Sequence, residues 1–244
     1  MSVIDTARLA VVNTIAVGRQ PQAFGSFVGP NLITGNLGVE SETALTGLGF
    51  GQFVDFRAGT LDSKGRLNDS HTLSLIRPGG TININHGFDS TFFGSVIGAG
   101  SFTKTGAGTL IRTGGNTYSG GTHIAGGTLS VNSGSNLGTG PMSFHGATLE
   151  ALTVGGGITL GLAITLNGGG GTFLADAGTT STLSGVISGS DALTKNGPGT
   201  LILTGANTYS GGTNIDAGTL VVNSYSDLGT GPVRLRGGTL KVLH

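Results

Sequence analysis

The chain has 244 residues, 49 of them glycine, and its twelve Lys and Arg side chains balance twelve Asp and Glu side chains. Glycine at this level without a strict three-residue period excludes collagen, and 36% hydrophobic against 10% charged residues argues against disorder. The neutral balance gives no support to a nucleic-acid partner, and the absence of cysteine excludes disulfides, thiolate metal sites and cysteine nucleophiles.

Residues 1–30 form the first segment. In its opening stretch, MSVIDTARLAVVNTIAVG, Asp5 and Arg8 interrupt what would be the apolar core of a signal peptide. Nowhere does an apolar run reach the roughly 18 residues that a membrane-spanning helix needs. We therefore expect neither an export signal nor a membrane-spanning helix in the sequence as given.

The same segment, SVIDTARLAVVNTIAVGRQPQAFGSFVGP from Ser2 to Pro30, is similar to a YVTN β-propeller repeat. The shared pattern is Val-Ile-Asp-Thr, then Val-Val-x-Thr-Ile-x-Val-Gly, then a proline. There is room for less than one blade, and a lone fragment of a blade would leave strand edges unpaired. The resemblance implies either part of a blade whose propeller lies upstream, which we favour, or a cap on the domain that follows.

Residues 31–93 show short apolar runs and glycine turns in a less regular rhythm, which favours the irregular start of a β-solenoid. Their most polar part is LDSKGRLNDSH, Leu61 to His71. Its charged and titratable residues are Asp62, Lys64, Arg66, Asp69 and His71. A small site could be built from these side chains, but a solvated loop is the favoured interpretation.

Residues 94–244 are dominated by an internal repeat. An offset of 91 residues aligns 103–152 with 194–243 without a gap, and 33 of the 50 aligned positions are identical. The similarity extends upstream, where GSVIGAGSFTKTG resembles SGVISGSDALTKNG with a slip of one residue. A repeat of about 90 residues is therefore the main unit of the sequence.

A shorter period lies inside each copy. Gly-Thr-Leu or Ala-Thr-Leu begins at 108, 127 and 147, and again at 199, 218 and 238, so the spacing is 19 and then 20 residues. Around each site apolar and polar residues alternate between glycine-rich turns, which predicts strands. We therefore expect an all-β parallel β-helix with coils of about 20 residues. Its interior columns would be Leu110, Leu129 and Leu149 in one copy and Leu201, Leu220 and Leu240 in the other, behind an outer ladder of threonines.

Two stretches carry a resemblance to a known family: GAGTLIRTGGNTYSGGTHIAGGTL and GPGTLILTGANTYSGGTNIDAGTL. Both resemble the passenger-associated transport repeat, also called the autotransporter-associated β-strand repeat. The resemblance implies a right-handed β-helix in a surface-exposed or secreted passenger of a Gram-negative bacterium, where the repeat is linked to efficient passage to the cell surface. It also implies a barrel domain elsewhere in the parent protein and contact with outer-membrane translocation machinery.

That repeat has no catalytic residues, so its most regular positions are expected to be structural. They are Asn116, Tyr118, Gly120, Gly121, Leu129, Asn207, Tyr209, Gly211, Gly212 and Leu220. An alternative makes the Asn-Thr-Tyr-Ser-Gly-Gly centre a carbohydrate or phosphate loop with the two tyrosines as stacking platforms. A turn whose asparagine bonds backbone groups and whose tyrosine packs on the next coil is the favoured interpretation.

The other titratable residues give no catalytic or metal pattern. Five histidines share no metal-ligand spacing, and we expect them at the surface: His71, His86, His123, His145 and His244. Carboxylates do not recur at matched positions, since Glu150 aligns with Lys241 and Asp216 with Ala125. We therefore expect no cofactor and no metal.

The function predicted from the sequence is a non-enzymatic stalk of an exported surface protein that aids translocation and folding. Partners consistent with this role are a host-surface or glycan ligand and other copies that meet the open ends of the solenoid. Two alternatives stay open on the same scaffold: a polysaccharide-active enzyme that uses Asp62 or Asp69, and a glycan-binding module that uses Tyr118 and Tyr209.

Overall fold

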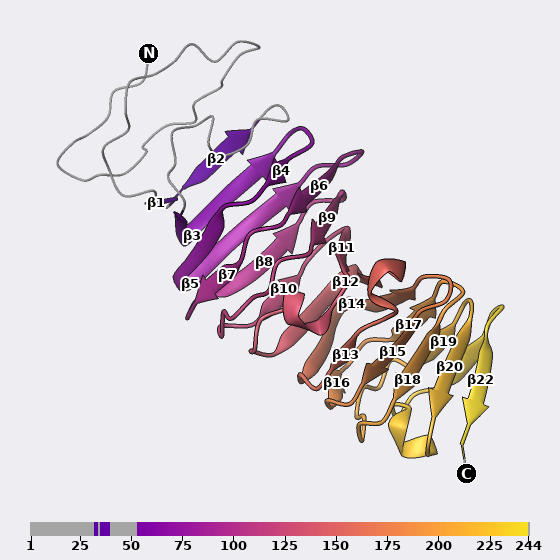
Figure 1. Cartoon of the computed structure of the whole chain (residues 1–244). Coiled ribbons are helices and arrows are strands. Elements are labelled where there is room, and N and C mark those ends of the chain that lie inside the picture. Colours follow the sequence, from indigo (N-terminus) through magenta and orange to yellow (C-terminus); the bar gives the residue numbers. More distant parts are fainter. Residues whose placement is uncertain (1–31, 34, 40–52, 244) are drawn as a thin grey trace, which may run out of the picture.

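The structure is a computed structural model that describes residues 32–33, 35–39 and 53–243, so the expectation for residues 1–30 lies outside the described residues. The described part consists of strands and three short 3-10 helices. Its strands follow one another along a single axis, from indigo β1 to yellow β22 (Figure 1). The all-β class predicted from the sequence is confirmed.

The N-terminal half contains β1 (Leu32–Ile33), β2 (Asn36–Val39), β3 (Phe53–Ser63), β4 (Asn68–Asp69), β5 (Thr72–Ile84), β6 (Asp89–Phe92), β7 (Val96–Gly98), β8 (Ser101–Thr105), β9 (Thr109–Arg112), β10 (Thr122–Ile124), β11 (Thr128–Val131) and η2 (Gly134–Asn136). The C-terminal half contains β12 (Met142–Ala151), η3 (Thr153–Gly155), β13 (Thr159–Leu160), β14 (Ile164–Ala175), β15 (Thr180–Leu183), β16 (Ile187–Gly189), β17 (Leu193–Asn196), β18 (Thr200–Leu203), β19 (Thr213–Ile215), β20 (Thr219–Val222), η4 (Tyr225–Asp227), β21 (Val233–Leu235) and β22 (Thr239–Val242).

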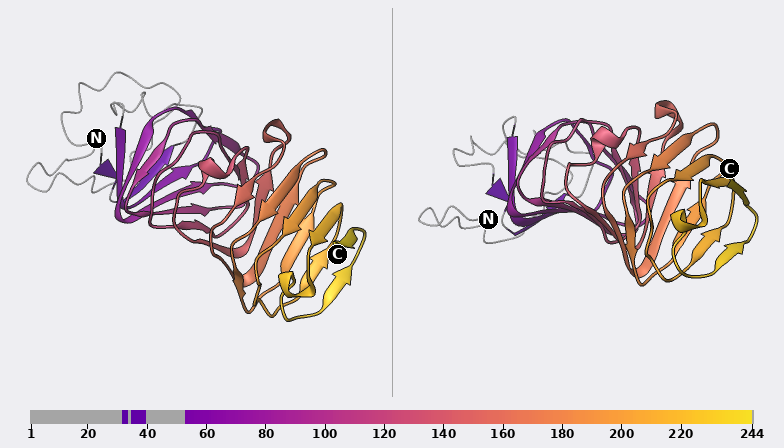
Figure 2. Two further views of the ribbon diagram at one scale, coloured as in Figure 1. Left: turned by 60° about the horizontal axis from the view of Figure 1, so that its bottom comes forward. Right: turned by 90° about the horizontal axis from the view of Figure 1, so that it is seen from below.

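The recorded strand pairings are parallel, and they join each strand to one a coil earlier or later in the chain. The result is a β-solenoid of about ten coils with three sides, named here after β7, β8 and β9, which occupy them in one coil. The long strands β3, β5, β12 and β14 each bend across a corner and serve two sides. Figure 2 shows the coils stacked around one continuous interior.

The predicted leucine columns are confirmed. Leu129 pairs with Leu110 on one side and with Leu149 on the other, and Leu220 pairs in the same way with Leu201 and Leu240. The threonine before each leucine pairs with its counterpart and is at least partly exposed. The alternation of a strand thus sends leucine inward and threonine outward in coil after coil.

The 91-residue repeat is not a whole number of coils. On the β8 side, parallel pairing joins β8 to β10, β10 to β12, β12 to β14 and β14 to β16. Strand β16 therefore lies on the same side as β8, four coils later. The 91-residue offset, however, makes β17 the counterpart of β8. Strand β17 follows β16 in the chain and pairs with the second half of β14 on the β9 side. The second copy is therefore turned by one side of the solenoid relative to the first.

No break in pairing separates residues 53–93 from the repeats. The two halves of β5 pair with β7 and β8, and β6 pairs with β9. Residues 158–189 likewise continue the solenoid through β13 to β16. The division at residue 94 marks where the sequence repeat begins, and as a domain boundary it stays a prediction.

Candidate functional site

The asparagine at the centre of each repeat bridges three consecutive coils. Oδ1 of Asn116 accepts the backbone N–H of Val96 at 2.7 Å, and its Nδ2 donates to the carbonyl of Asn136. The three residues follow one another at intervals of 20 residues. The matching residues of the second copy are Asn207, Ile187 at 2.8 Å and Asp227. Each side chain therefore satisfies a buried donor in the preceding coil and a buried acceptor in the following one.

The tyrosine of each repeat is an interior residue. Tyr118 and Tyr209 are 1% and 0% exposed, and their hydroxyls lie 2.5 and 2.6 Å from the hydroxyls of Thr122 and Thr213. A buried ring offers no face to a sugar, so the alternative that makes these tyrosines stacking platforms is wrong. Each ring lies against the first glycine of a Leu-Gly-Thr-Gly-Pro turn one coil later, where a Cβ would come within 2.6 Å of the ring.

The paired glycines that follow the tyrosine allow adjacent coils to approach closely. A Cβ on Gly120 would lie 2.3 Å from the carbonyl carbon of Gly100, and Gly121 has a φ of +100°. The corresponding residues of the second copy are Gly211 and Gly212. Only glycine combines this closeness with a left-handed backbone at low cost.

A capped 3-10 turn follows the last strand of each repeat. Oδ1 of Asn136 in η2 accepts the N–H groups of Asn132 and Ser133 at 3.0 and 2.8 Å, and Asp227 in η4 accepts the corresponding pair. The hydroxyl of Ser133, the N-cap residue, accepts the N–H of Ser135 at 3.2 Å, so the two side chains form a capping box at the start of the turn. This motif holds the carbonyl to which the repeat asparagine donates, so the two features act together.

Two buried lysines were missed by the sequence analysis. Nζ of Lys104 donates to the carbonyls of Thr105, Gly106 and Gly126 at 2.8, 2.9 and 3.0 Å. Lys195 makes the same contacts with Asn196, Gly197 and Ala217. Each ammonium group thus joins a corner of its own coil to the corner of the next. A signal was available, because Thr-Lys-x-Gly stands at the same place in both copies.

Burial lowers the pKa of both lysines from the usual 10.5 to about 8. Between those two values the unfolded chain binds more protons than the folded chain, so the free energy of unfolding rises with pH there. Below pH 8 both states hold the protons, and these lysines add no pH dependence.

We therefore expect stability to increase between pH 8 and about pH 9.5, and the double variant Lys104→Met with Lys195→Met to lose most of that slope. Urea unfolding at several pH values, followed by circular dichroism, measures it. An equal slope in the double variant would show that other groups cause the increase.

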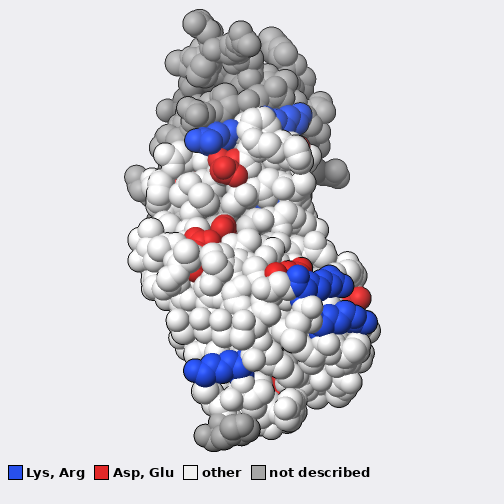
Figure 3. Space-filling model, turned by 90° about the vertical axis from the view of Figure 1, so that its right-hand side faces the viewer, with Lys and Arg blue, Asp and Glu red and all other residues white. Residues whose placement is uncertain are grey.

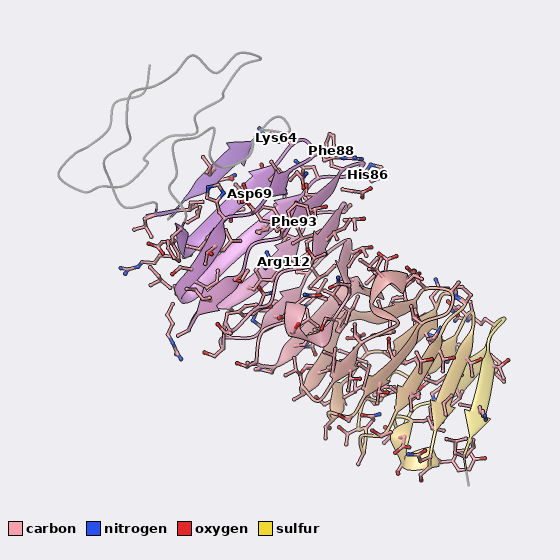
Figure 4. All side chains as sticks on the ribbon, viewed as in Figure 1. Lys64, Asp69, His86, Phe88, Phe93 and Arg112 are labelled. Carbon is pink, nitrogen blue, oxygen red and sulfur yellow. The ribbon has the colours of Figure 1, made fainter. Side chains whose placement is uncertain are left out.

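Arg112 is a buried cation that has no carboxylate partner within the described ranges. It is 2% exposed, its Nη2 donates to Gly94 at 3.1 Å and to Asn116 at 2.8 Å, and its guanidinium lies 5.8 Å from the ring centre of Phe102. Burial lowers its pKa to about 10, and Nη1 has no hydrogen-bond partner among the described residues. Figure 4 marks its position among the strands of the N-terminal half.

The second copy has Leu203 at the position of Arg112, surrounded by the same asparagine and tyrosine. Because an incompletely paired buried charge adds little stability, we expect Arg112→Leu to cost less than about 1 kcal/mol or to stabilise the fold. The reverse change, Leu203→Arg, should cost more than about 2 kcal/mol, because it buries a charge in an interior packed around a leucine, and Leu193 replaces the ring of Phe102. Thermal unfolding of both variants checks this contrast, and a large loss with Arg112→Leu would contradict it.

The polar insert is not the solvated loop that was favoured. Asp69 and His71 are 2% and 5% exposed, and their Oδ1 and Nδ1 atoms lie 2.9 Å apart. Asp62 lies on the outer face of β3 instead, where it accepts the amide of Asn83 at 2.6 Å, while Lys64 and Arg66 are exposed. Strand β4 runs through the insert and turns the side chain of Asp69 inward, so the structure does not bring the five residues together.

Burial of His71 also makes the expectation of five surface histidines wrong in part. His86 and His145 are exposed, His123 is half-buried, and His244 lies outside the described residues. Over the described ranges no group of three or more His, Cys, Asp or Glu side chains could hold a metal ion. Asp62 and Asp69, offered for a polysaccharide-active enzyme, point to opposite faces of the wall.

Charged side chains are sparse on the face drawn in Figure 3. Blue and red groups are scattered over a mostly uncharged surface, and both signs occur near both ends. One ion pair joins Arg236 to Asp216 at 3.8 Å. This face therefore has no extended region of one sign that would attract a polyanion over long range.

Comparison with known proteins agrees with the geometry of the two repeats. A family model described as passenger-associated-transport-repeat matches residues 102–131 and 193–222. These ranges contain the lysine, asparagine and tyrosine positions described above, so the chain contains two passenger-associated transport repeats.

A curated relative is the adhesin BmaC autotransporter of Brucella suis biovar 1, which is 45% identical over 160 residues. The match covers 62% of this chain and 5% of that protein, so the chain spans a small part of its length. No solved structure matches the chain. In the described part of the chain, no helix is long and apolar enough to cross a membrane.

Proposed function

We propose that this chain is a non-enzymatic section of the shaft of an autotransporter-like surface protein, and that its repeats help the passenger to fold coil by coil during export. Support comes from the two passenger-associated repeats and from the likeness to an autotransporter adhesin. The signal peptide, the barrel and the translocation machinery belong to this proposal as parts of the parent protein or its host.

The observation that carries the proposal is the coil-bridging asparagine. Each one is satisfied only when the preceding coil is in place, and it offers its amide to the carbonyl of the coil that follows. A coil alone buries too little to fold, so stacking on a finished neighbour supplies the missing stability. A chain that emerges end first could therefore fold progressively and resist sliding back.

The experiment places the whole chain between an export signal and an outer-membrane barrel in a Gram-negative host and counts surface-exposed chains by antibody labelling of intact cells. The chain should reach the surface, and a variant with Asn116→Leu and Asn207→Leu should do so severalfold less. Asn223→Ala, at an exposed asparagine, is the control. Equal display of the unfolded double variant would contradict a role for folding in export.

Adhesion is a second proposed role, supported by the name of the curated relative, which is an adhesin. The described part of the chain is long and regular, and the face drawn in Figure 3 is mostly uncharged, as a display shaft requires. The interior positions of the repeat tyrosines exclude them as contact residues, so any ligand would meet the outer faces and corners.

A further inference from the structure

A shallow hollow lies on the corner between the β7 and β8 sides, across three consecutive coils. Its lining includes Arg77, Ala99, Ser101, Ser119, Gly120 and His123. Arg77 belongs to β5, Ser101 begins β8, and His123 is the middle residue of β10. We call this feature the corner hollow.

The hollow exists because close coil packing removes side chains from this corner. A Cβ on Gly100 would lie 2.7 Å from the Cα of Gly79, and one on Gly120 would lie 2.3 Å from the carbonyl carbon of Gly100. Real Cβ atoms do not approach backbone so closely, so successive coils must place glycine here. The result is a strip of bare backbone bordered by larger side chains.

The border of the corner hollow is polar and carries one full positive charge. Arg77 is exposed, and no Asp or Glu is among the lining residues. Nδ1 of His123 lies 2.7 Å from the hydroxyl of Ser143, and burial together with His145 lowers the pKa of His123. His123 is therefore neutral near pH 7 and offers hydrogen bonding rather than charge.

Hydroxyl groups complete the lining. Ser119 is exposed, and the hydroxyl of Ser101 donates to the carbonyl of Pro78 at 3.0 Å, which leaves its oxygen able to accept a further hydrogen bond. A guanidinium recognises a carboxylate with two parallel hydrogen bonds, while serine hydroxyls and a neutral imidazole suit the hydroxyls of a sugar.

We propose that the corner hollow binds a carboxylated sugar unit of an acidic polysaccharide, with Arg77 on the carboxylate and Ser101, Ser119 and His123 on the ring hydroxyls. This inference deepens the adhesive role proposed above and rests on it. The single charge and shallow shape indicate weak binding that gains strength where many shafts meet one polysaccharide.

The second repeat provides an internal comparison. At the positions of Arg77 and His123, the 91-residue offset gives Gly168 and Asn214, while the serine and glycine of the turn are kept as Ser210 and Gly211. The second copy also has Ala192 in place of Ser101 and Asp191 in place of Gly100, and its arginine, Arg234, comes from the following coil and lies near Gly212. The second copy therefore does not repeat the arrangement of Arg77 with Ser101 and His123. We therefore expect one site in each chain although the repeat occurs twice.

The experiment titrates the purified whole chain with oligogalacturonate, with dextran sulfate, which is sulfated but has no carboxylate, and with neutral dextran of similar length, using isothermal calorimetry. We expect saturable binding of the carboxylated oligosaccharide at one site per chain and none of dextran. Arg77→Gln should weaken binding at least tenfold, and His123→Asn, which copies the second repeat, severalfold.

Arg66→Gln is the matched control, because Arg66 is an exposed arginine away from the corner, and it should leave binding unchanged. The proposal is overturned if Arg77→Gln binds like the unchanged chain, if Arg66→Gln weakens binding equally, or if the sulfated or neutral oligosaccharide binds as tightly. These outcomes concern the purified chain in solution, so they are independent of whether the repeats assist export.

Discussion

Tyr209→Ala should destabilise the chain by about 3–5 kcal/mol, since it removes a fully buried aromatic ring from a packed interior. The loss has two sources. The ring lies against Gly229 of the next coil, where a Cβ would come within 2.6 Å of it, and the hydroxyl of Thr213 loses its partner at 2.6 Å. Urea unfolding followed by circular dichroism measures the change.

Tyr225 offers a matched control, because the same substitution there removes a ring that is 74% exposed. Tyr225→Ala should change stability by no more than about 0.5 kcal/mol. Tyr209→Phe separates the two sources of the loss, since it keeps the ring and leaves only Thr213 unpaired, at a cost of about 1–3 kcal/mol. Similar effects of Tyr209→Ala and Tyr225→Ala would show that the interior position of Tyr209 is wrong.

The coil period and the leucine columns could be predicted from the sequence because parallel coils align equal residues. Leu110, Leu129 and Leu149 recur at nearly the coil length, and the alternation around them gives the inward face. The identical spacing in the two copies also indicates the register in which successive coils pair. Where the alternation pattern and the residue type both indicate an interior position, the sequence is sufficient to predict that position.

Where residue type and pattern disagree, prediction failed. Lys104 lies two residues after the buried Phe102, and Lys195 lies two residues after the buried Leu193. Because side chains alternate between the two faces of a strand, this spacing alone places both lysines inside. A lysine side chain ordinarily favours the surface, and the three carbonyls that converge on each Nζ come together only when the next coil is in place. Asp69 and His71 were assigned to a solvated loop for the same reason.

The sequence also did not predict that the second repeat is rotated by one side of the solenoid relative to the first. Coils between the copies differ in length, because β14 adds residues at its bend, and the sequence alone does not say where they are added. The consequence is functional, since equivalent outward residues of the two copies face different directions. A flat partner can therefore reach only one copy of any surface motif at a time.

The asparagine bridge leads to the second large prediction. Asn207→Leu should destabilise the chain by about 2–5 kcal/mol, since it leaves the N–H of Ile187 and the carbonyl of Asp227 buried without partners. Leucine has a similar volume and prevents water from replacing the amide, so the cost reflects lost hydrogen bonds rather than an empty space. Urea unfolding gives the free energy difference.

Asn223→Leu is the control, because Asn223 is exposed and only its backbone N–H is bonded by the cap, at 2.8 Å from Asp227. It should change stability by less than about 0.5 kcal/mol. Since Asn207 joins the coils on both sides of it, its loss should also uncouple them, and amide exchange should quicken in β16 and β21 before it does in β3. Uniform exchange along the solenoid would mean that the bridge adds stability without linking neighbouring coils.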